Sequence, residues 1–256
     1  MAVRRRKPPR ILDVTPTSEA PARLPIIDAL RGFAVCMMIA YHTCYDTTFF
    51  RLTHFQFLTD WRWMAWRDGI VTSFLLLVGL SLVLAERQSA RGFIKRWWQI
   101  VGGAACVSVA SYYLFPNSFI YFGILHFNAI AALIGRGLLP LGWRVGVLAV
   151  LALAIGLFVQ IPAMNPNWLN WIGLVTQKPV TEDYVPLLPW LGVVFAGMAL
   201  GFCWKRTQFA LPQWVRALQP HLPQPLLWLG RHSLLVYLIH QPILFALFYA
   251  QYTLTR

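Results

Sequence analysis

The chain has 256 residues, of which 58% are hydrophobic and only 12% are charged, and its net charge is +13. So few polar residues cannot cover the surface of a soluble globule of this length, which excludes a water-soluble enzyme and indicates an integral membrane protein. The positive charge does not indicate nucleic-acid binding, because the basic residues lie in short clusters between apolar runs and form no groove-lining face.

The first 22 residues are polar and basic, and they contain no apolar run. They include Arg4, Arg5, Arg6 and Lys7, and we expect a disordered cytoplasmic tail over residues 1–22. The apolar run that follows is long enough to span a membrane, so we interpret it as an uncleaved helix and not as a removed signal peptide. Residues 23–256 then form one transmembrane domain.

Seven apolar runs follow the tail, each near the roughly 20 residues that a bilayer core requires. We expect spans at 26–47, 68–86, 98–115, 119–139, 143–161, 186–204 and 226–250. Loops rich in Lys and Arg alternate with loops poor in them, so the positive-inside rule places the amino terminus in the cytoplasm and the carboxyl terminus outside. The prediction is an all-α, polytopic bundle of about seven transmembrane helices in the plasma (inner) membrane.

The first apolar run carries a stripe of ionisable residues, where a lipid-facing helix would have none. The stripe consists of Asp28, Arg31, His42 and Asp46. Arg31 and His42 are eleven residues apart, which is three helical turns plus about 20°, so both lie on one face. Charged groups inside a membrane span are costly and are usually functional. This stripe is therefore the main indication of what the protein does.

Two interpretations stand for each end of the stripe. Asp28 and Arg31 form either a local ion pair or an anion site, in which the planar guanidinium faces an inward cavity and binds a phosphate. His42 and Asp46 have the (i, i+4) spacing at which a carboxylate can hold one imidazole nitrogen and leave the other free as a base. The alternative for His42 is a hydrogen-bonded packing residue.

Five segments of the chain resemble a known family. The segment IIDALRGFAVCMMIAYH (26–42) contains the Arg-x10-His pattern of membrane-embedded acyltransferases and resembles the opening of the heparan-α-glucosaminide N-acetyltransferase catalytic-domain family. Also similar are RDGIVTSFLLLVGLSLVLA (67–85), GILHF (123–127), DYVPLLPWLGVVFAGMALG (183–201) and GRHSLLVYLIHQPIL (230–244). The resemblance implies transfer of an acyl group, typically acetyl from acetyl-CoA, to a hydroxyl or amino group of an extracytoplasmic sugar or glycan.

The resemblance leaves two histidines as candidates for the general base of this reaction. In the animal lysosomal members the position that matches His42 looks to be Asn, and the catalytic histidine lies in the loop before the second helix. Here Thr53 stands at the matching spacing and His54 follows it. Histidine is the expected base because neutral imidazole titrates near working pH. We expect His42 to be the base, with Asp46 beside it and His54 as the second candidate.

Polar residues of other segments complete the expected site. For acetyl-CoA we expect Asp28, Arg31, His126, Arg231, His232, Tyr237 and His240, and for the acceptor Asp68, Asp183 and Trp61. Each has a structural alternative. Polar residues in the last run can hydrogen-bond neighbouring helices, acids at helix starts favour the helix dipole, and Trp61 fits an interfacial belt.

Two other classes of function remain open. A sugar or lipid transporter would share the arginine and histidine stripe, but the chain lacks two similar halves with broken spans. An intramembrane haem-binding electron carrier would use His42, His126 and His240 as axial ligands, but no single run has two histidines at the spacing that stacks haems. The expected partners are the lipid bilayer, acetyl-CoA and a sugar or glycan acceptor, with a homodimer left open. No metal is expected, because the four cysteines have no paired spacing. No nucleic acid is expected, because the basic residues lie in short clusters between the apolar runs.

Overall fold

The structure is a computed structural model that describes residues 24–254, and every regular element in that range is a helix. The longer helices are α1 (Pro25–Phe49), α2 (Trp61–Leu84), α3 (Ala90–Leu114), α4 (Ile124–Leu138), α5 (Val145–Phe158), α6 (Leu187–Arg206), α7 (Gln213–Leu218), α8 (Gln224–Arg231) and α9 (Ser233–Leu254). The all-α prediction is confirmed. The predicted basic tail lies outside the described residues.

Five helical stretches are long and apolar enough to cross a membrane. They are α1, α2, the stretch from α4 to α5, α6 and α9. α4 and α5 have 15 and 14 residues, so each alone is shorter than the roughly 20 residues of a full span. α3 carries Arg91, Lys95 and Arg96 in its first two turns. The number of seven spans and the orientation of the termini therefore stay predictions.

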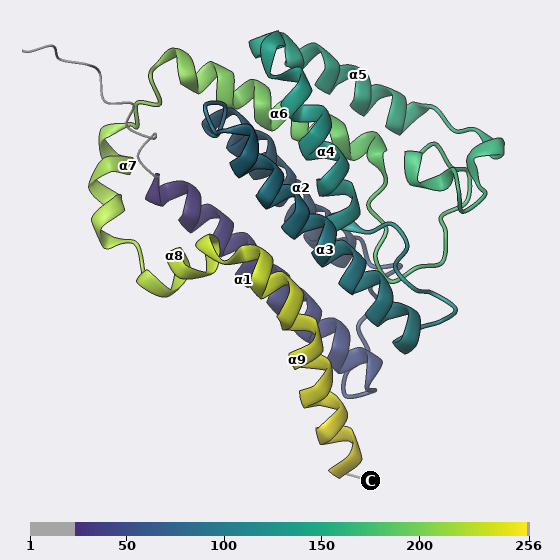
Figure 1. Ribbon diagram of the computed structural model, residues 1–256. Helices are drawn as coiled ribbons and strands as arrows, with labels where there is room; N and C mark the ends of the chain where they lie inside the picture. Colours follow the sequence, from purple (N-terminus) through teal and green to yellow (C-terminus); the bar gives the residue numbers. More distant parts are fainter. Residues whose placement is uncertain (1–23, 255–256) are drawn as a thin grey trace, which may run out of the picture.

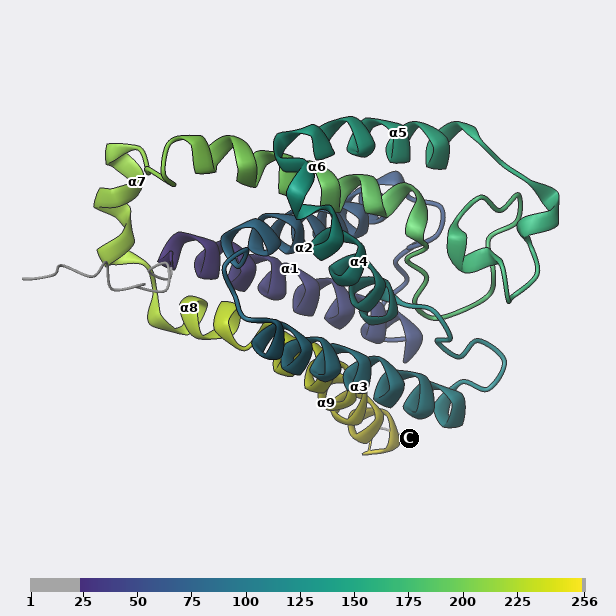
Figure 2. The same ribbon diagram turned by 45° about the horizontal axis from the view of Figure 1, so that its top comes forward.

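The seventh predicted span is not one continuous helix. The backbone leaves the helical conformation at His232 (φ −109°, ψ 23°), which divides the run into α8 and α9. Short 3-10 turns connect other elements at Leu139–Arg144, Pro162–Met164, Asn170–Ile172 and Gln219–His221. The break at His232 gives α8 a direction different from that of α9 (Figure 1), and α8 lies beside the first half of α1 (Figure 2).

The helices pack as two groups that share α2 (Figure 1). The larger core joins α2, α4, α5 and α6 around the fully buried side chains of Leu75, Phe127 and Met198. A smaller core joins α1 to α9 through Val35 and Val236. α1 thus lies between α2 on one side and α8 and α9 on the other, so its polar stripe faces other helices.

Glycines allow a close approach of α1 and α8. A Cβ added at Gly32 would overlap the carbonyl oxygen of Leu226, and one added at Gly230 would overlap the carbonyl oxygen of Asp28. Two backbones can come this near only where small residues leave room. This contact fixes α8, and with it the start of α9, against the first half of α1.

Candidate functional site

Two histidines from opposite ends of the chain meet between α1 and α9. Nε2 of His240 lies 3.2 Å from Nδ1 of His42, and the ring centroids are 4.9 Å apart. His240 is buried and His42 is partly buried. The apolar contact of Val35 and Met38 with Val236 lies one to two turns away and sets the register of the two helices. We call these two residues the histidine pair.

Backbone carbonyls determine which ring nitrogens of the histidine pair carry protons. Nδ1 of His240 lies 2.7 Å from the carbonyl oxygen of Tyr237, so it donates, and Nε2 of the neutral ring accepts. Nδ1 of His42 lies 3.1 Å from the carbonyl oxygen of Met38, so it also donates and shares its proton with Nε2 of His240. This hydrogen-bond pattern assigns the lone pair of neutral His42 to Nε2. That nitrogen has no hydrogen-bond partner within residues 24–254.

Asp46 lies one turn beyond His42 but does not bind it, so the expected hydrogen bond between them is wrong. Side chains of a helix tilt toward its amino terminus, and the ring of His42 accordingly turns back to Met38. Asp46 Oδ1 instead accepts a hydrogen bond of 2.8 Å from Nε2 of Gln241. The side chain is 1% exposed, and Oδ2 has no partner in the described part of the chain. Asp46 therefore links α1 to α9 beside the histidine pair.

Asp183 approaches the same region from the loop before α6. Its Oδ2 accepts a hydrogen bond of 2.8 Å from the backbone N–H of Ile124, and the hydroxyl of Tyr237 is a second hydrogen-bond partner. Burial raises the pKa of Asp183, while these two donors and the nearby ammonium of Lys178 oppose the shift. Because the carbonyl of Tyr237 also holds His240, Asp183 is connected to the histidine pair through one residue.

An ion pair in the first turns of α2, formed by Arg67 and Asp68, lies at the same end of α1 as Asp183. Nη2 of Arg67 lies 2.9 Å from Oδ1 of Asp68. Burial and the Arg67 guanidinium lower the pKa of Lys178, while Asp68 and Asp183 oppose that shift. Lys178 comes from the long loop between α5 and α6, and the sequence analysis did not single it out. No local pattern marks this lysine, because Arg67 and Asp68, two of its charged neighbours in space, are far away in sequence.

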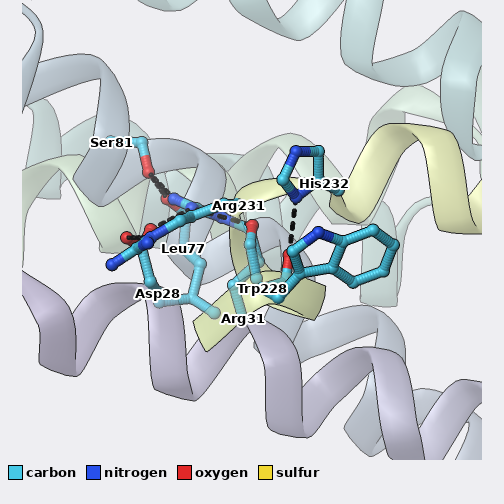
Figure 3. Close-up of polar contacts among 8 residues, drawn as sticks. Asp28, Arg31, Leu77, Ser81, Trp228, Arg231 and His232 are labelled. Carbon is cyan, nitrogen blue, oxygen red and sulfur yellow. Dashed lines mark hydrogen bonds and ion pairs between the residues drawn. The ribbon is translucent and has the colours of Figure 1, made fainter. Parts of the chain in front are cut away.

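Asp28 and Arg31 lie at the other end of α1, in the network of Figure 3. Arg31 donates to Oδ1 of Asp28 at 3.1 Å and to the hydroxyl of Ser81 in α2 at 2.9 Å. Nε of Arg231 lies 3.4 Å from Oδ2 of Asp28. The side chains of Arg31 and Asp28 are 17% and 13% exposed. This geometry supports the ion-pair interpretation, because the Arg31 guanidinium joins α1 to α2 and both oxygens of Asp28 are occupied.

His126 is also held by hydrogen bonds, away from the histidine pair. Its Nδ1 accepts from the backbone N–H of Gly123 at 3.2 Å, and its Nε2 lies 3.1 Å from the hydroxyl of Ser108 in α3. Both ring nitrogens are therefore used to fix the start of α4 against α3. No nitrogen of His126 is left for an axial bond to haem, so this geometry gives no support to His126 as a haem ligand.

The remaining predicted site residues lie near the surface. His232 stacks on Trp228 with ring centroids 4.6 Å apart, and its Nδ1 donates to the Trp228 carbonyl at 2.9 Å. Trp61 is 69% exposed, with the guanidinium of Arg62 over its ring. His54 is exposed in the loop between α1 and α2. The structure thus brings His42, Asp46, Tyr237 and His240 together, with Asp183 behind Tyr237. It gathers Asp28, Arg31 and Arg231 in a second cluster at the other end of α1.

A family model matches most of the chain, including every residue of this cluster. Residues 23–242 match the model described as "Heparan-alpha-glucosaminide N-acetyltransferase, catalytic". The chain belongs to this family. Members of this N-acetyltransferase family use acetyl-CoA as the donor, and membership together with the apolar helices indicates a membrane acetyltransferase. The comparisons with curated proteins and with solved structures gave no match.

Proposed function

We propose that the protein transfers an acetyl group from acetyl-CoA to a hydroxyl or amino group of a sugar or glycan, with His42 as the general base. The observation that carries this proposal is the hydrogen-bond pattern of the histidine pair, which leaves Nε2 of neutral His42 unprotonated and without a partner among the described residues. An attacking hydroxyl or ammonium group must lose a proton, and a positioned imidazole is the side chain best suited to accept it at neutral pH.

In the proposed reaction, Nε2 of His42 takes a proton from the acceptor. The acceptor oxygen or nitrogen bonds to the thioester carbonyl carbon, and the bond from that carbon to sulfur breaks. The proton then passes from His42 to the CoA thiolate, so the products are CoA thiol and the acetylated acceptor. His240 acts as a positioning residue, because its Nε2 accepts the Nδ1 proton of His42 and stabilises the imidazolium that forms.

His54 is the less favoured base. It is exposed in the loop between α1 and α2, and no hydrogen bond orients its ring within residues 24–254. A general base acts efficiently only when a second group holds it at a fixed orientation toward the proton it takes. His42 has two such groups, the Met38 carbonyl and His240.

The two substrates are proposed to reach the histidine pair from opposite ends of α1. The Arg31 end is proposed to face the cytoplasm, where acetyl-CoA is available, because the predicted loops on that side are rich in Lys and Arg. Arg231 and His232 are proposed to contact the phosphates of acetyl-CoA. Asp68, Asp183 and Lys178 at the other end are proposed to contact the acceptor. The proposed location is the plasma (inner) membrane.

The test is acetyl-CoA turnover by the purified full chain in detergent, measured as thiol release with glucosamine and with neutral sugars as acceptors. His42→Ala is expected to lose turnover by about 100-fold or more while it still binds acetyl-CoA and keeps its melting temperature. His54→Ala, as the matched control, is expected to turn over like the wild type. Wild-type turnover by His42→Ala would reject His42 as the base, and loss in His54→Ala alone would move the role to His54.

A further inference from the structure

The end of the bundle opposite the Arg31 network contains an aromatic cleft that the proposed reaction does not use. The cleft has a volume of about 510 Å³ and is lined by Phe49, Phe50, Arg51, Phe245, Tyr249 and Tyr252. Five of these residues are aromatic and one is a cation. We call it the Arg51 cleft.

Aromatic rings from α1 and α9 form the apolar wall of the Arg51 cleft. Phe50 is 7% exposed, and its ring centroid lies 5.0 Å from that of Phe245 and 5.9 Å from that of Tyr252. Figure 1 shows the last turns of α9 running past the end of α1. Such a wall can pack an acyl chain without the rearrangement of flexible side chains.

Arg51, which provides the positive charge of the cleft, has an unusual backbone conformation. Arg51 has φ +61°, a region that residues other than glycine rarely adopt. The backbone N–H groups of Arg51 and Leu52 bind the carbonyl oxygens of Thr48 and Thr47 at 3.0 and 2.8 Å, which fixes the turn. The guanidinium makes no ion pair or hydrogen bond within residues 24–254. All its donors are therefore available beside an apolar surface.

The position of Arg51 along α1 matches the headgroup level of a bilayer. Arg31 and Arg51 are 20 residues apart, which is about 30 Å along a helix, and a hydrocarbon core is about 30 Å thick. With the Arg31 network at one membrane surface, Arg51 therefore lies at the other. A free guanidinium at that depth, next to an apolar cleft, matches the charge and shape of a lipid phosphate and its chain.

We propose that the Arg51 cleft binds one anionic phospholipid, with the phosphate on Arg51 and the first part of an acyl chain against Phe50 and Phe245. A second aromatic cleft at this end provides a comparison. It has a volume of about 310 Å³ and is lined by Phe55, Asp60, Arg62, Trp63 and Trp66. There the Arg62 guanidinium covers the ring of Trp61, and the Asp60 carboxylate repels a phosphate. The second cleft therefore does not bind the same lipid.

The test is native mass spectrometry of the delipidated full chain, titrated with phosphatidylglycerol in the absence of acetyl-CoA. The wild type is expected to bind one lipid, and Arg51→Gln is expected to bind it about tenfold more weakly, because a charge-assisted hydrogen bond is lost. Arg62→Gln is the matched control and is expected to bind like the wild type. Equal binding by Arg51→Gln and the wild type, or an equal loss in Arg62→Gln, would overturn the proposal.

Two further measurements distinguish lipid binding from binding of free phosphate and from a loss of stability. Glycerol phosphate is expected not to compete with the lipid, and full competition would show a site for free phosphate instead. Arg51→Gly removes the guanidinium, but glycine adopts positive φ without strain, so this variant is expected to keep its melting temperature and still lose the lipid. Wild-type lipid binding by Arg51→Gly would contradict the role of the guanidinium. Each outcome is independent of the proposed acetyl transfer.

Discussion

Nε2 of His240 lies 3.2 Å from Nδ1 of His42, although the two residues are 198 positions apart in the chain. This contact joins α1 to α9 and directs the lone pair of His42 away from His240. The influence of His240 on the proposed reaction is therefore indirect. In the proposed reaction, His240 is expected to orient His42 and to stabilise its positive charge.

Replacing His240 is expected to affect turnover more than substrate binding. His240→Ala leaves the Nδ1 proton of His42 with only the Met38 carbonyl, so we expect kcat to fall by roughly 10- to 100-fold, less than for loss of the base itself. The KM for acetyl-CoA is expected to change little. His240→Gln keeps an acceptor oxygen for that proton and is expected to restore part of the activity. Steady-state kinetics over a range of pH test this, and equal losses in both variants would indicate a packing role only.

Gly32→Ala is expected to destabilise the fold, because the added methyl group would overlap the backbone of α8 at Leu226. Overpacking against backbone costs about 1–3 kcal/mol. Gly102→Ala in α3 is the matched control, since a Cβ there meets nothing within 4 Å, and alanine in a helix is favoured over glycine by up to about 1 kcal/mol. Melting temperatures in detergent should differ between the two variants, and identical values would contradict the close approach of α1 and α8.

Arg31→Gln tests whether the arginine of α1 has a structural role. Loss of its contacts with Asp28 and Ser81 is expected to cost about 2 kcal/mol, less than for a fully buried pair, because Arg231 still faces Asp28. Ser81→Ala removes one hydrogen bond and is expected to cost about 1 kcal/mol. Melting temperature and acetyl-CoA affinity are measured together. Weaker acetyl-CoA binding at an unchanged melting temperature would support the anion-site interpretation instead.

Asp183→Asn is expected to reduce the pH dependence of stability. Burial raises the pKa of Asp183 in the folded state, above the value of about 3.9 for an unfolded chain. This group therefore stabilises the fold below the unfolded pKa, and that contribution is lost as pH rises through the raised pKa. Asparagine cannot ionise and keeps an oxygen for the Ile124 N–H. As the pH rises from about 4 to about 7, the melting temperature of the variant should fall less than that of the wild type. An equal fall in both proteins would show that another group is responsible.

Local sequence pattern was sufficient to predict much of the fold and one residue of the candidate site, His42. The first predicted span, 26–47, agrees closely with α1 at Pro25–Phe49, because the length of an apolar run is a property of contiguous residues. The same reasoning placed Arg31 and His42 on one helix face. It was wrong about Asp46 and His42, because spacing along a helix does not tell which partner a neighbouring helix will offer.

The sequence by itself determined that this is a helical membrane protein of an acetyltransferase family with an ionisable first helix. Only the tertiary structure decided that His42 meets His240, that Arg31 binds Ser81, and that Lys178 lies near Asp68. The physical reason is the separation along the chain over which each kind of information acts. Hydropathy and helical periodicity act between near neighbours in the chain, whereas a hydrogen bond or an ion pair needs two groups within a few ångströms, and for distant segments only the packing of helices brings them there.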